Sequence, residues 1–417
     1  GNLVLSNGDG ELDEFVNYAW DSRPVEIRVG EAGADFDFYF TIFTGESKSI
    51  EFDDDIVQVV LRDRQDDFNV DFPPAIYKGA GVSDNVAGQP KPLCFGQVSN
   101  ISPILRDTSS RTYQIHDGPI ESIDAVYEGG VELTLGSDYS VDLANGEFTL
   151  SADPDGIITA DAKGAAPGGT YLSSPANIIR EIVTTYGGLD DPADLDTGSF
   201  ADLESANSAD IGVFISSSTN ILSVLDEIIN TVGGFYGFER DGRFFVGRLD
   251  LPTGSGLDVD ARFDQTNIIE RTRLASAVPN YRFRVQYAKN YTQMRESDFG
   301  SGVSQARRDY LVRDGKYEVV EDSSVQTAYP SSNELVVQAL FAEAADAAQE
   351  ATRLAGIYDE QREVYRIRVK TQPYTLELND IVEITFDRYN LLAGKRFRVI
   401  SVTEDAATNE VELELWG

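Results

Sequence analysis

The chain has 417 residues and a formal net charge of −37, because 71 Asp and Glu side chains outnumber 34 Lys and Arg. This charge excludes stable nucleic-acid binding as the main activity and disfavours anionic membranes, since phosphate groups are bound by basic surfaces. The sequence is 41% hydrophobic and 10% aromatic. This apolar content is enough to fill the cores of several domains of about 150 residues each. A folded, multi-domain protein with an acidic surface is expected.

Period-two alternation predicts a β meander in residues 1–75. Apolar residues alternate over 25–29, and over 36–42 with Asp35 and Asp37 in the opposite phase. A further apolar run covers 56–61. Prolines and glycines between 71 and 92 then indicate an extended connection, so we interpret 76–118 as a linker with strands.

Residues 119–163 have the pattern of an inserted small β-sandwich or barrel. Short apolar runs alternate there with the pairs 129–130, 145–146 and 155–156, which read Gly-Gly, Asn-Gly and Asp-Gly. The Asn-Gly and Asp-Gly pairs accept the positive φ values of tight hairpin turns.

Residues 164–250 predict an α+β lobe. Ser174 and the proline after it begin a helix that ends at the glycines 187–188, and a second apolar helical stripe covers 220–232. The acidic stretch 190–210 between them is predicted to be a loop. Strands at 235–239 and 243–249 flank Asp241 and Gly242, which is a hairpin signal.

The remaining residues predict an Arg-rich β region at 251–330, an Ala-rich helix within 331–360 and a C-terminal β domain at 361–417. The β region opens with a strand at 280–288. The helix covers 334–358 and begins with a capping box of Ser331 and Glu334. The fold class is therefore mainly β with α+β lobes, in several domains.

No motif with catalytic spacing occurs, because the phosphate loop, the dinucleotide fingerprint, the nucleophile elbow and the zinc-protease helix are all missing from the sequence. The single Cys94 and the single His116 exclude an internal disulfide and a histidine-rich metal site. Cys94 lies in an apolar stretch, so a core residue is favoured over a nucleophile activated by His116. We expect no catalytic residue and no cofactor.

Three acidic segments are candidate calcium sites. Asn7, Asp9, Glu11 and Asp13 alternate as ligands in a calcium loop do, but an EF-hand needs Gly and Glu where Leu12 and Tyr18 stand. The run 53–55 favours a solvated turn between strands, and the acids of 190–196 favour a solvated loop. No metal site is expected. No stretch reaches the roughly 18 apolar residues of a membrane helix, and the N-terminus is not typical of a signal peptide.

Basic residues concentrate in one stretch of 55 residues. They are Arg262, Arg271, Arg273, Arg282, Arg284, Lys289, Arg295, Arg307, Arg308, Arg313 and Lys316. One interpretation is an interface for an acidic neighbour such as a second copy of this chain. The favoured one is a strand surface whose arginines pair with local carboxylates, because Arg282 and Arg284 alternate with apolar residues.

Over most of its length the chain resembles the tail hub (baseplate hub) proteins of long-tailed phages and gene transfer agents. The segments that carry the resemblance are Asn7–Gly10, Trp20–Gly30, Thr41–Gly45, Lys91–Gly96, Tyr113–Gly118, Gly234–Phe244, the Ala-rich helix, Leu378–Ile384 and Val411–Gly417. They are structural rather than catalytic signatures.

The resemblance implies a homotrimeric ring at the virion tail tip, made in the host cytoplasm. Two small β domains per chain, here 1–75 and 361–417, would imitate tail-tube subunits, and 119–163 would be peripheral. The implied partners are a distal tail or tail tube protein, a tape measure protein, and a central fibre or receptor-binding protein. Phage DNA would meet the chain only in transit. No segment matches the hydrolase domains of some members, so no enzymatic activity is expected.

Two other functions remain open from the residues alone. One is a secreted glycoside hydrolase acting on polysaccharides through a pair of carboxyl groups. The other is an adhesin that binds carbohydrate through exposed aromatic side chains such as Tyr236 and Trp20.

Overall fold

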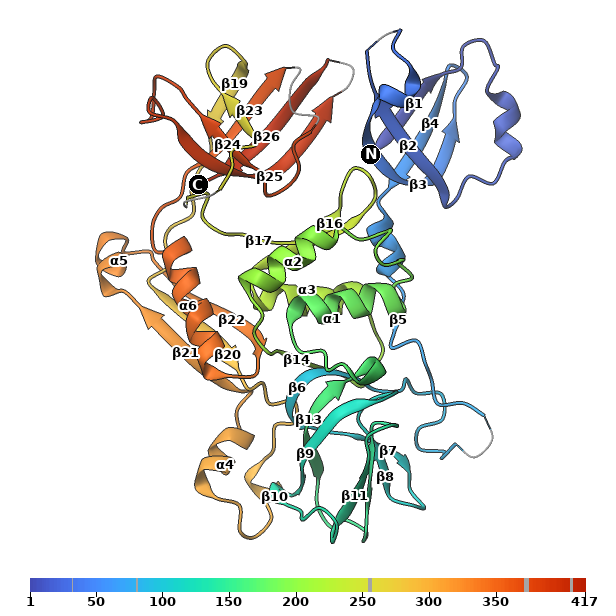
Figure 1. The fold of residues 1–417 in the computed structure, drawn as a ribbon, viewed down its shortest axis with the longest axis vertical. Helices are drawn as coiled ribbons and strands as arrows, with labels where there is room; N and C mark the ends of the chain where they lie inside the picture. The colour runs from blue at the N-terminus through green and yellow to red at the C-terminus, as the bar shows by residue number, and fades with distance from the viewer. Residues whose placement is uncertain (32, 80–81, 254–256, 371–374, 406–407) are drawn as a thin grey trace.

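In the computed structural model, an N-terminal lobe and a C-terminal lobe lie side by side at one end of the molecule (Figure 1). A central α+β lobe lies in the middle, and a small β lobe lies at the opposite end. The structure describes residues 1–31, 33–79, 82–253, 257–370, 375–405 and 408–417. The predicted class, mainly β with α+β lobes, is confirmed.

The N-terminal lobe is an antiparallel sheet with the order β1-β4-β3-β2. Its strands are β1 (Asn2–Ser6), β2 (Arg23–Val29), β3 (Phe40–Phe52) and β4 (Ile56–Arg62), and the turn predicted at 53–55 joins the last two. The strand predicted over 36–42 was wrong for its first part, because Phe36–Phe38 form a 3-10 turn, η2, and it is confirmed from Phe40, where β3 begins. The Asp35 carboxylate accepts from the backbone N–H of Asp37 and so stabilises the turn against a strand.

Two sheets enclose the core of the small β lobe. One has the order β10-β9-β13-β6-β14 and the other β11-β12-β8-β7. The strands are β6 (Leu93–Ile101), β7 (Ile104–Asp107), β8 (Thr112–Gln114), β9 (Ile120–Glu128), β10 (Val131–Glu132), β11 (Tyr139–Asp142), β12 (Glu147–Leu150), β13 (Ile158–Ala165) and β14 (Gly212–Ile215). The sheets extend beyond the predicted insert 119–163, because β13 pairs with β6, and β6 pairs with β14.

Helices with apolar faces fill the centre of the central lobe. They are α1 (Pro175–Glu181), which continues as a π-helical turn, η5 (Ile182–Tyr186), then α2 (Thr197–Ala206) and α3 (Ile221–Thr231). The helices predicted at 175–186 and 220–232 are confirmed. The loop predicted at 190–210 was wrong for α2, whose first N–H groups are capped by the carboxylate of Asp196.

The hairpin predicted in this lobe is confirmed as β16 (Gly234–Phe238) and β17 (Phe244–Arg248). A two-stranded contact joins β5 (Asp71–Phe72) to β15 (Thr219–Asn220). Two short helices, α4 (Gln305–Leu311) and α5 (Ser323–Ala328), lie in the segment 251–330 that was predicted to be an Arg-rich β region.

A sheet with the order β21-β20-β22 completes the central lobe. Its strands are β20 (Arg282–Tyr287), β21 (Lys316–Glu321) and β22 (Glu334–Phe341), and α6 (Ala344–Tyr358) packs on it. The single helix predicted at 334–358 was wrong for its first part. Leu335 and Val337 face the core in alternation with exposed Val336, so Glu334 begins a strand instead of completing a capping box.

The C-terminal lobe is a curved sheet with the order β18-β24-β25-β26-β23-β19. The strands expected after residue 361 are confirmed as β23 (Val364–Lys370), β24 (Ile381–Ile384), β25 (Lys395–Asp405) and β26 (Glu410–Trp416). Both edges come from an earlier segment, β18 (Ala261–Phe263) and β19 (Ile268–Arg273). The C-terminal β unit therefore includes residues that precede the predicted boundary.

Candidate functional site

The tip of the β16–β17 hairpin lies between the two end lobes (Figure 1). Arg64, which follows β4, donates to the carbonyl oxygen of Gly242 at 3.2 Å. On the other side of the tip, Arg240 donates to the carbonyl oxygen of Leu376 at 2.5 Å and forms an ion pair with Glu404 at 2.7 Å. The hairpin tip therefore connects both end lobes to the central lobe.

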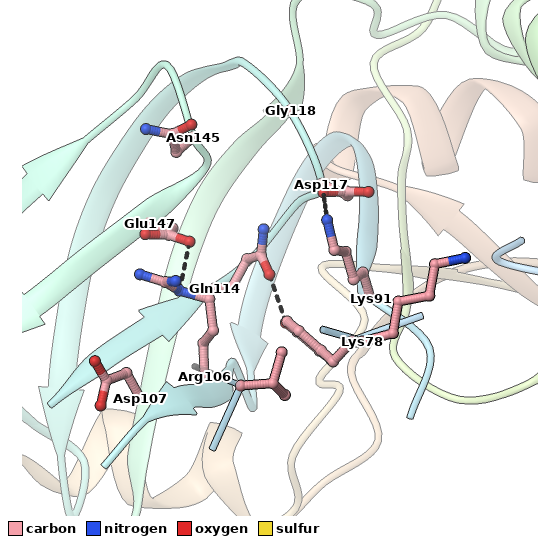
Figure 2. A pocket seen from close by; sticks show the side chains of 11 residues that line it. Lys78, Lys91, Arg106, Asp107, Gln114, Asp117, Gly118, Asn145 and Glu147 are labelled. Carbon is pink, nitrogen blue, oxygen red and sulfur yellow. Dashed lines mark hydrogen bonds and ion pairs between the residues drawn. The ribbon is translucent and has the colours of Figure 1, made fainter. Parts of the chain in front are cut away.

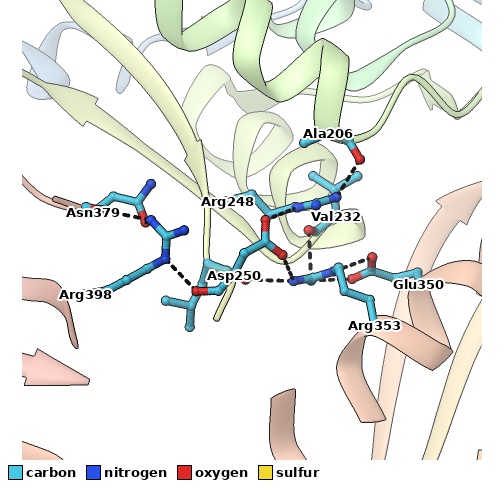
Figure 3. A network of polar contacts seen from close by, with 9 residues as sticks. Ala206, Val232, Arg248, Asp250, Glu350, Arg353, Asn379 and Arg398 are labelled. Atoms are coloured by element: carbon cyan, nitrogen blue, oxygen red, sulfur yellow. Dashed lines mark hydrogen bonds and ion pairs between the residues drawn. The ribbon is translucent and has the colours of Figure 1, made fainter. Parts of the chain in front are cut away.

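A buried polar network forms a second junction with the C-terminal lobe (Figure 3). Glu350 on α6 is 2% exposed and accepts from Arg353 at 2.6 and 2.8 Å. Arg353 also donates to the carbonyl oxygen of Leu249 at 2.7 Å and to the carboxylate of Asp250 at 3.1 Å. The carboxylate of Glu350 is thus neutralised in place, as a buried charge requires.

Arg398 on β25 extends this network into the C-terminal lobe. Its guanidinium donates to the carbonyl oxygen of Asp250 at 2.5 Å and to the carbonyl and side-chain oxygens of Asn379 at 2.9 and 3.0 Å. Burial lowers the pKa of Arg398. The polar contacts hold the C-terminal sheet in one orientation against the central lobe.

An acidic hollow of about 630 Å³ lies between these two junctions, with Asp196, Asp202, Glu239, Glu377 and Asp380 among its lining residues. Burial, followed by the negative charge of Asp196, raises the pKa of Glu239 to about 7. Burial likewise raises the pKa of Asp380 to about 6. Glu239 and Asp380 therefore change charge nearer to neutral pH than ordinary carboxyl groups do. Glu239 also pairs with Arg243 at 2.9 Å.

A second hollow, of about 390 Å³, lies where the linker crosses the small β lobe (Figure 2). Lys91 pairs with Asp117 at 2.8 Å, and Arg106 pairs with Glu147 at 2.8 Å. Charges of opposite sign are matched within the hollow, so it presents a polar surface without a strong preference for anions or cations.

The N-terminal lobe keeps large apolar side chains on its outside. Phe36, Phe38 and Phe40 are 61%, 76% and 64% exposed. Among the described part of residues 1–62, the buried apolar side chains are Val57, Val59 and Leu61, all on β4. An exposed aromatic cluster on a lobe with so small an interior is typical of an assembly surface.

The structure brings Cys94 and His116 together, but not as a nucleophile and its base. The backbone N–H of Cys94 donates to Nδ1 of His116 at 3.0 Å. Burial raises the pKa of the Cys94 thiol and lowers that of His116 to about 4. Both side chains are buried, as the core interpretation predicts.

The acidic clusters form hydrogen-bonded turns. Asn7 is buried, accepts from the backbone N–H of Leu12 at 2.8 Å and donates to Asp13 at 2.8 Å. In the 190–196 segment, Asp191 pairs with Arg180 at 2.6 Å. Over the described ranges, no group of three or more His, Cys, Asp or Glu side chains is arranged to hold a metal ion.

Both interpretations of the basic stretch find support. Local pairing is confirmed for several members, since Arg262, Arg273 and Lys289 form ion pairs with nearby carboxylates, as does Arg308. Arg282 and Arg284 also pair locally, with Glu321 and Glu334. They line a hollow at the sheet β21-β20-β22 together with Arg313 and Lys316.

The two aromatic side chains proposed for an adhesin are only partly exposed. Trp20 is half-buried and donates to the carbonyl oxygen of Phe15 at 2.9 Å. Tyr236 is half-buried, donates to Asp226 at 2.8 Å and packs on Phe244. The expectation that these rings are exposed was wrong.

None of the junction residues was predicted from the sequence; they are Arg240, Arg353 and Arg398. Only Arg353 had a local signal, because Glu350 stands three residues before it, which is the spacing of a helical ion pair. In the parts of the chain that the structure describes, no helix is long and apolar enough to cross a bilayer.

No protein-family model matches the chain, and no curated protein does. Among solved structures, it is similar to a chain of the virion of a native gene transfer agent particle, with a TM-score of 0.52 and 13% identity over 82% of this chain and 85% of that one. It also matches the 43 kDa tail protein of prophage MuSo2 from Shewanella oneidensis, with a TM-score of 0.42 and 11% identity over 99% of this chain and 88% of that one. The first likeness shows a shared fold.

Proposed function

We propose that this chain is a structural hub protein of a phage-like tail, located at the tail tip, without enzymatic activity. The observation that carries the proposal is the fold shared with a chain of the gene transfer agent virion, which extends over 82% of the present chain. A likeness over 82% of the chain extends over more than one lobe, rather than over one common β module.

The position of the end lobes supports a ring that meets the tail tube. Each chain carries two β lobes side by side at one end (Figure 1). Three copies would present six such lobes to a sixfold tube, which fits a homotrimer bound to a tail tube or distal tail protein. The tape measure protein and a central fibre or receptor-binding protein are the further partners proposed.

The acidic surface suits a channel through which DNA passes. A chain of net charge −37 repels phosphate, so DNA would not adhere to a lumen built from three copies. In this proposal the contact with DNA is transient and occurs during ejection.

Native mass spectrometry of the purified chain over rising concentration tests the ring, and a trimer is the expected result. Gold-labelled antibody on intact particles tests the location, and label at the tail tip is expected. A chain that stays monomeric at high concentration, or label confined to the head, would overturn the proposal.

A further inference from the structure

The sheet β21-β20-β22 has one covered and one open face. Phe283 and Val285 on β20 are buried in the core that also contains residues of α6. Arg282 and Arg284 alternate with them, so they lie on the opposite face. That face carries Val319, 41% exposed, and Val336, 45% exposed.

Cations gather at the open face and at the end of the sheet beside it. Lys316 begins β21 as the register partner of Tyr287, which has the phase of the covered face, so Lys316 lies at that end rather than on the open face itself. A hollow of about 600 Å³ is lined by Arg282, Arg284, Arg313 and Lys316, with Asp314 as its carboxylate. Arg282 and Arg284 share Glu334, at 3.3 and 3.6 Å, and Arg282 also pairs with Glu321 at 3.6 Å, so these two arginines are compensated within the sheet. Arg313 and Lys316 are exposed, and within the described residues no carboxylate lies within 4.0 Å of either nitrogen group.

Apolar and aromatic side chains surround the central cation of this face. Arg284 is the register partner of Val319 on one side and of Val336 on the other. Its guanidinium lies 4.5 Å from the ring centroid of Tyr317. Arginine, tyrosine and exposed aliphatic residues in one patch are the composition of a protein interface rather than of a solvated surface.

A complementary segment occurs elsewhere in the same chain. Residues Asp35–Phe40 read Asp-Phe-Asp-Phe-Tyr-Phe, so acids alternate with aromatic rings. Phe36, Phe38 and Phe40 are all more than half exposed, and both aspartates are exposed. The segment offers negative charge for the cations at the hollow, and apolar rings for the exposed valines of the open face.

The two surfaces lie on opposite sides of the molecule. The lobe of β1–β4 is at the upper right of Figure 1, and β20–β22 are on the left at about the middle height of the molecule. A contact between two different patches is heterologous, so it joins copies head to tail and closes into a ring when the rotation permits.

We propose that the Asp35–Phe40 segment of one copy docks on the open face of β21-β20-β22 of the next copy. Asp35 and Asp37 meet Arg313 and Lys316, and the phenylalanine rings cover Val319 and Val336. The inference rests on the proposed ring and assigns the surface that closes it.

Charge reversal tests the contact. We expect Arg313→Glu with Lys316→Glu to weaken self-association at least about tenfold by analytical ultracentrifugation, since opposed charges become like charges. Adding Asp35→Lys and Asp37→Lys to the same chain should restore it. Lys48→Glu with Arg388→Glu, two exposed cations elsewhere, is the matched control and should leave association unchanged.

Disulfide trapping gives an independent test. Cys94 is fully buried, so a chain with Phe38→Cys and Val336→Cys exposes only the two new thiols. Oxidation should yield covalent trimers, whereas Phe38→Cys with Val141→Cys, on β11 of the small β lobe, should yield none.

The outcomes separate this inference from the proposed hub. If the native chain forms trimers that neither reversal nor trapping affects, the assigned interface is wrong and the ring stands. If the native chain remains monomeric at every concentration, the ring and the interface both fail.

Discussion

Glu350 and Arg353 show how a few charged residues hold the lobes together. The carboxylate of Glu350 is almost inaccessible, and two hydrogen bonds from Arg353 compensate for its burial. The same guanidinium contacts Leu249 and Asp250 in the segment that leads to the C-terminal lobe. A change at one residue therefore affects both a helix and a junction.

Arg353→Met is expected to cost about 3–5 kcal/mol of unfolding free energy, because it leaves a buried carboxylate without its partner. Urea unfolding measures the loss. Arg366→Met is the matched control: its pair with Glu414 is exposed, so a loss under about 1 kcal/mol is expected. Equal losses in both variants would contradict the role given to the network.

Glu239 should make the junction pH-dependent. Its pKa is about 7 in the folded chain against an ordinary 4.5, so between these values the folded state holds a proton that the unfolded state has lost. Stability therefore falls as the pH rises from about 4.5 to 7. Relative to Glu239→Gln, the native chain should lose about 1–3 kcal/mol across this window. Urea unfolding at several pH values gives the difference in unfolding free energy between the native chain and Glu239→Gln. If this difference does not change with pH, the raised pKa of Glu239 is contradicted.

Among the secondary-structure elements, the β16–β17 hairpin depends on the glycine in its turn. Gly242 has a φ of +84°, which L side chains rarely adopt, and an added Cβ would lie 2.8 Å from Cγ2 of Thr44 on β3. Glycine therefore permits both the turn and the close approach of the N-terminal lobe.

Gly242→Ala should destabilise the chain by about 1–2 kcal/mol more than Gly136→Ala does. Gly136 has a φ of +89° with nothing within 4 Å of an added Cβ. Gly136→Ala should therefore lose stability only through the unfavourable backbone conformation, without a steric clash. Urea unfolding gives the comparison, and trypsin cleavage near Arg64 should be faster only in the Gly242 variant. Equal effects would mean that the contact with Thr44 does not hold the lobe.

Elements with consistent local signals were predictable. The helix α3 has an apolar stripe and an Asn220 cap, and its boundaries match the expectation. The prediction of one helix over 334–358 was wrong in its first part because Leu, Val and Ala occur in both helices and strands. Pairing with the neighbouring strand β20 makes the first part a strand. Helix α2 was missed because its acidic, Gly-containing sequence is typical of a loop, although Asp196 caps it.

For the molecule as a whole, charge and burial are distributed unequally. The central, small β and C-terminal lobes each have a buried apolar cluster, whereas the N-terminal lobe exposes its phenylalanines. Three copies would bring a large negative charge together, so a ring needs apolar contact and the cations at and beside the open sheet face. The proposed interface supplies both.

The sequence by itself determined the acidic surface, the β-rich class, the positions of most turns and caps, and the buried character of Cys94. These features depend on composition or on neighbours a few residues apart. Only the tertiary structure decided which charges meet: Arg240 reaches Leu376 across 136 positions, and Arg398 reaches Asp250 across 148. Packing between lobes sets those distances, and it also determines which arginines pair with carboxylates and which remain exposed.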